Sequence, residues 1–354
     1  MNHRHRILCA AAFLAVAGIL GASRVHAQAA ETTWIPFPYV FYTPETSLAG
    51  GVILMVVNGD QNVVRGGGFA SLNGQAEGFV SGEYFLPDDR MRFTLDSYAA
   101  RFPNKFFGIG PDAATEEDYV PFECAVDVTA GFRLAPGLYL GPRLRWFSSW
   151  MQEIDGNGAL AQGAVPGSGG AGLIAPGFRL TWEGRDSPVA PTRGFFAELS
   201  GSEAFTTFGS GSDFPSISLD ARVYHAPFRQ WKVVFAAQLV AALTGGDPPF
   251  QELPRLGGDE LLRGYFDGRY RDRALLAVQG EVRIPVWWRF GVVVFAAAGQ
   301  VAHDALAFRA ENTKLSAGAG LRFILDEKSG AGFRADVAVG ESGADFYFNL
   351  GEAF

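Results

Sequence analysis

The stretch YVPFECAVDVTAGFRL, residues 119–134, decides the fold because two kinds of side chain alternate along it. Every even position from 122 to 134 is apolar, whereas Glu123, Asp127 and Arg133 stand at odd positions. Successive side chains of a β-strand point to opposite sides, so this order predicts a strand with one apolar face and one polar face. Alternation sustained over about ten residues is typical of a transmembrane β-barrel.

The same alternation recurs in later segments of the chain. Residues 138–150, 231–239, 276–284 and 333–339 each carry apolar side chains on one face. The opposite face repeatedly carries Arg on one segment and Glu or Asp on a neighbour, whereas a soluble β-sandwich would show mainly Lys, Ser and Thr to water. A lumen crossed by ion pairs explains this face, and a mean hydropathy of +0.09 suits a wall that is apolar on one side. The sequence therefore predicts an all-β fold, a transmembrane antiparallel barrel.

Turn residues between these segments divide the chain into about 16 strands, and an even number returns both ends to the periplasmic side. The strands are expected near 36–43, 48–58, 63–72, 76–86, 90–101, 119–134, 137–151, 171–184, 194–205, 214–225, 231–243, 274–285, 289–301, 314–325, 331–340 and 344–354. The longer outer loops are expected at 102–118, 152–170, 206–213, 244–273 and 302–313. Pro142 and Pro176 fall inside two adjacent strands and predict a bulge or bend, because proline lacks an N–H for the ladder.

The first residues predict export of the chain. Arg4 and Arg6 precede a mostly apolar run over 7–20, and the small-residue site Val25-His26-Ala27 follows. This order is typical of a signal peptide over residues 1–27, which leaves a short periplasmic lead-in at 28–35 and a barrel over 36–354. The net charge of −8 disfavours a nucleic-acid partner. We therefore expect a protein of the bacterial outer membrane, with outer-membrane lipid around it.

Four motifs then support a family resemblance. They are FPYVFYTPETSLAGGVILMVV at 37–57, WEGRDSPVAPTRGFFAELS at 182–200, GGDELLRGYFDGRY at 257–270 and DFYFNLGEAF at 345–354. In this order and spacing they resemble the first hairpin, the central hairpin, the sixth outer loop and the closing strand of the BamA/TamA superfamily, the bacterial surface antigen family. The resemblance covers essentially all of 36–354.

The resemblance implies roles for individual residues. In that family the Arg of the sixth loop folds into the lumen and meets an acidic residue of the barrel wall. The corresponding loop motif is Leu262, Arg263, Gly264 and Tyr265. The aromatic closing strand is recognised by the barrel assembly machinery, which is thereby an expected partner. The corresponding signal is Phe346, Phe348, Leu350 and Phe354, which we expect to form one lipid-facing row of the last strand.

The chain departs from the family pattern at the acidic partner. The family's Phe-x-Asp-x-Gly corresponds here to residues 295–299, Phe-Ala-Ala-Ala-Gly, where the acid is missing. Glu281 lies on the polar face of the preceding strand and is the first candidate partner of Arg263, and Asp336 is the second. We predict an Arg263–Glu281 contact; the alternative is an ordinary loop arginine exposed to solvent.

A second departure concerns the N-terminal side. Family members that insert or translocate proteins carry periplasmic substrate-binding domains before the barrel, and residues 28–35 leave room for none. The chain is therefore expected to represent a barrel-only branch. Whether a separate periplasmic partner supplies client capture is left open by the sequence.

No residue pattern predicts an enzyme, a cofactor or a metal site. Beyond the signal peptide the sequence has two histidines, His225 and His303, and neither has the Ser and carboxylate neighbours that a barrel hydrolase needs. Residues 167–172 fit G-x-G-x-x-G, but they open a strand rather than a helix, so no phosphate-binding geometry follows.

Three functions remain open from the sequence. The first is outer-membrane biogenesis, as a pore that inserts or translocates an unfolded protein client and is gated by the long loop. The second is a passive or solute-selective channel, and the third is a structural or surface barrel, or a barrel enzyme. The first predicts a weak seam where the last strand closes against a first strand that we expect to be short, at 36–43.

Overall fold

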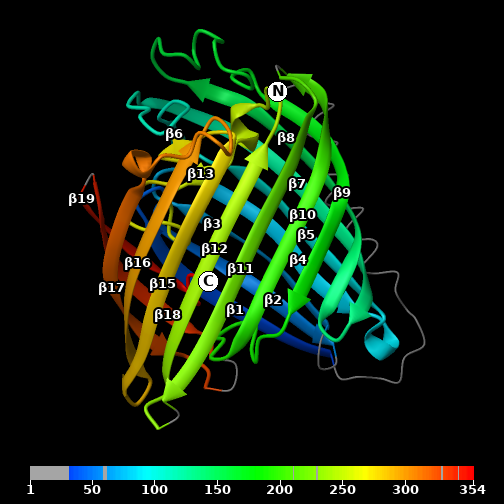
Figure 1. Cartoon of the computed structure of the whole chain (residues 1–354), viewed down its shortest axis with the longest axis vertical. Coiled ribbons are helices and arrows are strands. Elements are labelled where there is room, and N and C mark those ends of the chain that lie inside the picture. Colours follow the sequence, from blue (N-terminus) through cyan, green and yellow to red (C-terminus); the bar gives the residue numbers. More distant parts are fainter. Residues whose placement is uncertain (1–31, 59–61, 210, 229, 328–329, 342) are drawn as a thin grey trace.

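The computed structural model describes residues 32–58, 62–209, 211–228, 230–327, 330–341 and 343–354. The signal peptide expected at 1–27 lies outside these residues. Sixteen long antiparallel strands form a closed barrel, which confirms the predicted class and strand number, and the short β6 extends the same sheet (Figure 1). The strands are β1 Thr32–Thr43, β2 Ser47–Asn58, β3 Asn62–Ser71, β4 Ala76–Phe85, β5 Met91–Arg101, β6 Asn104–Phe106, β7 Glu117–Ala135, β8 Leu138–Ile154, β9 Ala171–Glu183, β10 Gly194–Gly209, β11 Phe214–Phe228, β12 Val233–Thr244, β15 Ala274–Trp287, β16 Phe290–Ala302, β17 Lys314–Ile324, β18 Gly332–Gly340 and β19 Gly343–Leu350.

The outer surface of the barrel is apolar, as the alternation predicts. On β7, for example, Val128, Phe132 and Leu134 are exposed on the outside, whereas Asp127 turns inward and pairs with Arg143. Exposed tryptophans gather at the end of the barrel where short turns join the strands, as in the aromatic girdles of membrane barrels. They are Trp34, Trp182, Trp231, Trp287 and Trp288. No helix among the described residues is long and apolar enough to cross a membrane.

The first strand is longer than the sequence indicates. β1 begins at Thr32, so residues 32–35 of the expected lead-in belong to the barrel. The prediction of a short first strand at 36–43 was therefore wrong. Pro36 and Pro38 lie within β1, and a proline cannot donate to a ladder. β1 nevertheless pairs with β2 throughout its length, and its other edge has a single registered partner. Prolines are tolerated on such an edge, because the missing N–H leaves no ladder bond unmade there.

Of the bulge or bend expected at Pro142 and Pro176, the bulge was wrong. β8 and β9 stay in continuous register through both prolines, with Pro142 opposite Phe178 and Leu144 opposite Pro176. The ladder between β8 and β7 is instead interrupted at Gly141 and Pro142. The ladder between β9 and β10 likewise skips Pro176, so each missing donor is accommodated by a gap on one side of its strand rather than by an extra residue.

The chain end departs from the predicted closing strand. Phe346, Phe348 and Leu350 alternate with the inward Tyr347 on β19, but the strand ends at Leu350. Phe354 lies apart from this row and is buried against residues of β11 and β12. The expectation that Phe354 belongs to the lipid-facing row was therefore wrong. Sequence alternation could not show this, because it says nothing of where the chain goes once a ladder has ended.

The loop between β12 and β15 is the longest outer connection and contains short elements of its own. These are the 3-10 helix η2 (Phe250–Glu252) and the two-stranded pair β13 (Arg255–Leu256) and β14 (Tyr270–Arg271). Leu256 and Tyr270 are buried against Leu275 and Ala277, which face inward from β15. The loop therefore packs on the inner face of the wall, and this packing positions the residues described next.

Candidate functional site

The backbone of the predicted loop motif, residues 262–265, has a conformation that few residue types adopt without strain. Leu262 and Gly264 both have left-handed φ angles, of 57° and 97°. A Cβ on Gly264 would come within 3.0 Å of the Gly340 nitrogen, so this glycine lets the loop backbone lie directly against the end of β18. Its N–H donates a hydrogen bond of 2.9 Å to the hydroxyl of Tyr347 on β19. The motif is thereby fixed to the two last strands of the barrel.

Arg263 lies between both of the acidic residues that the sequence offered as partners. Its Nη2 is 2.5 Å from Glu281 Oε1 on β15, and its Nη1 is 2.6 Å from Asp336 Oδ2 on β18. The Arg263 side chain is 1% exposed, and both carboxylate side chains are fully buried. Its guanidinium also lies 3.5 Å from the ring centre of Phe295. Phe295 thus covers the cation from the strand in which the family's acid is missing.

A wider set of charges surrounds these three residues. Arg283 Nε is 2.9 Å from Glu281, and Arg322 Nη1 is 2.6 Å from Asp336. The same network continues through Arg334 to Asp259 at 2.6 Å and through Arg322 to Glu352 at 2.8 Å. Four cations and four carboxylates therefore alternate, which offsets the cost of burying isolated charges.

Sequence reasoning did not assign roles to these additional arginines, although a signal was present. Arg283 stands two residues after Glu281, and Arg334 stands two residues before Asp336. A spacing of two on a strand places both members on one face. Arg322 and Glu352 had no such signal, because their contact joins β17 to the segment after β19.

Leu262 and Tyr265, at the two ends of the motif, also bind it to the barrel wall. Leu262 is fully buried in a cluster with Leu275 and Val301. The Tyr265 hydroxyl donates to the Leu315 carbonyl at 2.9 Å and accepts from the Glu341 N–H at 3.1 Å. All four motif residues therefore contact the barrel wall.

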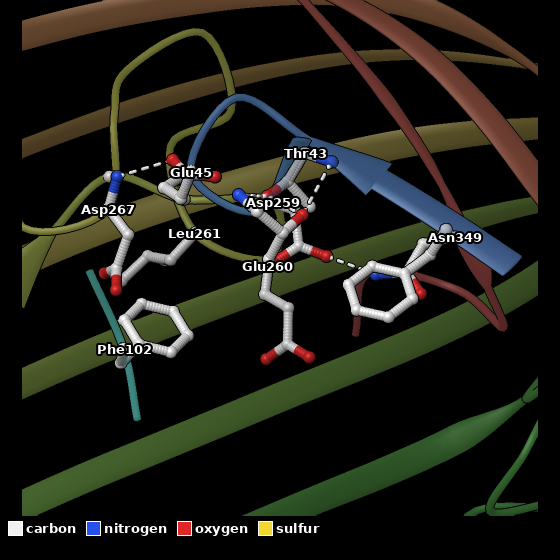
Figure 2. A pocket seen from close by; sticks show the side chains of 12 residues that line it. Thr43, Glu45, Phe102, Asp259, Glu260, Leu261, Asp267 and Asn349 are labelled. Carbon is white, nitrogen blue, oxygen red and sulfur yellow. Dashed lines mark hydrogen bonds between the residues drawn. The ribbon is translucent and has the colours of Figure 1, made fainter. Parts of the chain in front are cut away.

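The same loop also touches the first hairpin. The Asp267 N–H donates a 2.7 Å hydrogen bond to Glu45 Oε1 in the turn between β1 and β2. Asn349 of β19 donates to Asp259 at 2.7 Å. Figure 2 shows these groups around a pocket whose other walls include Thr43, Phe102 and Leu261. The loop thus bridges the two strands that close the barrel, and burial raises the pKa of Glu45 to about 7.

We expect the contact between the first hairpin and the loop to weaken as pH rises. A carboxyl whose pKa is raised from its ordinary 4.5 to about 7 binds more protons when docked than when released. Docking is therefore most stable below pH 4.5 and loses that stability as pH rises through about 7. Hydrogen-exchange protection of residues 257–268, corrected for intrinsic rates, should be at least about tenfold higher at pH 5 than at pH 8.

Glu45→Gln provides the control for this pH dependence. The amide keeps the size of the side chain and an acceptor oxygen for Asp267, but it cannot ionise. The variant should show the same protection at both pH values. A wild-type protection that does not change with pH would contradict the assignment to Glu45.

The seam between the first and last strands is narrow. β1 and β19 share one registered pair, Tyr42 with Phe348. By contrast, β18 and β19 pair continuously from Gly340 and Gly343 down to Phe333 and Leu350. The seam therefore has far fewer backbone hydrogen bonds than its neighbours.

Other residues that the sequence singled out lie away from this site. His225 is exposed on β11 and His303 is exposed in the loop after β16. Among the described residues no three His, Cys, Asp or Glu side chains form a group that could hold a metal ion.

Together, the fold and the site define a transmembrane β-barrel with a narrow seam and a long loop bound to the inner wall by a buried arginine. A family described as the Omp85 superfamily domain matches residues 113–354. The chain belongs to the Omp85 superfamily, in agreement with the family resemblance of its motifs, and this places it among outer-membrane barrels.

Solved structures of this family share the fold. BamA from Haemophilus ducreyi lacking POTRA domains 1–3 is 13% identical, with a TM-score of 0.64 over 91% of this chain and 70% of that one. CdiB from Acinetobacter baumannii is 15% identical, with a TM-score of 0.53 over 92% of this chain and 60% of that one. CdiB from Escherichia coli is 12% identical, with a TM-score of 0.59 over 90% and 63%. The chain thus spans less than two thirds of either CdiB chain. No curated protein sequence matches the chain significantly.

Proposed function

We propose that this barrel inserts or translocates protein clients at the outer membrane and that the seam between β1 and β19 is where it opens. Membership of the Omp85 superfamily supports the class of activity. The proposal treats the protein as a non-enzymatic machine, in which the work is done by strand pairing and by movement of the loop. Its expected partners are membrane lipid, an unfolded client and a periplasmic protein that delivers the client.

The outer edge of β1 is the observation that carries this proposal. Of the described residues in β1, only Tyr42 has a registered partner on β19, whereas the whole strand pairs with β2. An edge with unpaired N–H and C=O groups is a template on which another strand can form. A client strand could therefore add to β1 at little cost, because one registered pair has to part.

The loop between β12 and β15 would control whether the lumen is open. Arg263 joins the loop to β15 and β18, and the same loop reaches Glu45 and Asn349 at the seam. Movement of the seam strands would therefore be transmitted to the loop. A permanently open solute channel has no need of such a connection.

Reconstitution into lipid vesicles tests the proposal directly. An unfolded outer-membrane barrel added as client should fold several times faster into vesicles that contain the purified protein than into empty ones, as followed by the gel shift of heat-resistant folded barrels. Single-channel recording on the same preparation provides the second readout. No acceleration, together with a large steady conductance that Arg263→Ala leaves unchanged, would instead establish a solute channel.

A further inference from the structure

The last four residues leave the barrel wall and turn into its interior. β19 ends at Leu350, and Gly351 follows with a φ of 77°, a conformation that glycine adopts without strain. The Gly351 N–H donates a hydrogen bond of 2.8 Å to the Gly332 carbonyl at the start of β18. Among the described residues this is the last backbone hydrogen bond between the chain end and the wall. Phe354 is then 5% exposed, and Figure 1 shows the chain end within the outline of the barrel near β11 and β12.

A pocket of three strands receives the Phe354 side chain. Tyr224 of β11 and Ala236 of β12 form its apolar walls. The centre of the Tyr224 ring lies 6.4 Å from the centre of the Phe354 ring. Arg283 of β15 covers it, with its guanidinium 5.6 Å from the centre of the Phe354 ring and 5.8 Å from that of Tyr224. Arg283 Nη2 also donates a 2.9 Å hydrogen bond to the Phe354 carbonyl oxygen. One arginine therefore recognises both the ring and the backbone of the occupant.

A second arginine recognises the residue two positions earlier. Arg322 Nε is 2.8 Å from Glu352 Oε2, and Arg322 is itself held by Asp336 at 2.6 Å. Arg283 is held in the same way by Glu281 at 2.9 Å. Both arginines are thus pre-positioned by buried wall carboxylates, so their donors stay in place whether or not the segment is bound.

The position of the segment links the pocket to the seam. Phe348, the registered partner of Tyr42, lies on β19 and stands six residues before Phe354 in the chain. Withdrawal of β19 from β1 would therefore pull on the segment through Gly351. The pocket would be emptied at the moment when the seam opens.

We propose that Tyr224, Ala236, Arg283 and Arg322 form a peptide-recognition site that residues 352–354 occupy at rest. Its ligand is a client segment with an acidic residue two positions before an aromatic one, the chemistry of Glu352 and Phe354. The inference rests on the proposed function, because it needs a protein client inside the barrel. The tethered segment competes at an effective concentration in the millimolar range, so client binding and seam opening are coupled.

Fluorescence anisotropy with a labelled peptide Gly-Glu-Ala-Phe tests this site on the purified barrel. A variant that lacks residues 351–354 should bind the peptide at least tenfold more tightly than the full chain. Arg283→Gln in that variant should weaken binding at least tenfold. Arg289→Gln should leave it unchanged, because Arg289 pairs with the exposed Glu327 outside the site. Absence of binding to the shortened barrel, or equal binding of the reversed peptide Phe-Ala-Glu-Gly, would overturn the proposal.

Phe354→Ala in the full chain covers the case in which the shortened barrel does not fold. This substitution removes the competing ring and should also raise peptide affinity, and an unchanged affinity would count against the site. The assay needs no client folding, so the two proposals fail separately. A barrel that binds the peptide but does not accelerate folding contradicts the proposed function, whereas acceleration without binding contradicts the recognition site.

Discussion

Arg263→Ala is expected to release the loop between β12 and β15 from the wall. The substitution leaves Glu281 and Asp336 buried without their shared cation, and loss of one partner of a buried ion pair costs about 3–5 kcal/mol. Arg283 and Arg322 still face these carboxylates, so we expect the lower end of that range. Limited proteolysis should then cut within residues 245–273 at least tenfold faster, and single-channel recordings should show larger, fluctuating conductance.

Two further variants make this expectation specific. Arg263→Lys keeps the charge, but a single ammonium group cannot reproduce the two-sided contact of a guanidinium, so it should give an intermediate release. Arg289→Ala removes an arginine from an exposed pair, which is worth at most about 1 kcal/mol, and should leave the loop intact. Proteolysis of Arg263→Ala at the wild-type rate would show that the buried contact does not hold the loop.

A disulfide across the seam is expected to abolish client folding by the reconstituted barrel. Tyr42 and Phe348 are Cα partners on β1 and β19, so cysteines at both positions have the separation that a disulfide requires. The oxidised double variant should lose the acceleration of client folding, because the edge of β1 can no longer part from β19. Reduction should restore it.

A second disulfide controls for the effect of cross-linking itself. Val337 and Phe346 are Cα partners on β18 and β19, where the ladder is continuous. Cysteines at these two positions should form a disulfide and leave client folding unchanged. Full activity of the oxidised seam variant would contradict the proposal that the barrel opens between β1 and β19.

Residue alternation, together with the charged inner face and the export signal, was sufficient to predict the barrel. The period of two along residues 119–134 follows from strand geometry, which is local, and it separates the outer from the inner face without reference to any neighbour. The same geometry placed Glu281 on the inner face and pointed to the partner of Arg263. Turn residues between the alternating segments then set the number of strands.

The contacts of the loop and of the chain end required the tertiary structure. Glu281 and Asp336 are 55 residues apart in the sequence, and only closure of the barrel brings both to Arg263. The full length of β1 was also not evident, because a sequence does not show how far a strand pairs with its neighbour. These features depend on how distant strands meet.

Phe354 shows this division most clearly. Its place after an alternating aromatic strand correctly indicated the strand itself, and the structure has Phe346, Phe348 and Leu350 on one face of β19. The sequence could not show that the ladder stops at Leu350 or that Phe354 contacts Tyr224 and Arg283. Alternation is dictated by the backbone of one strand, whereas the burial of Phe354 depends on residues of β11, β12 and β15 that only the closed barrel brings within reach.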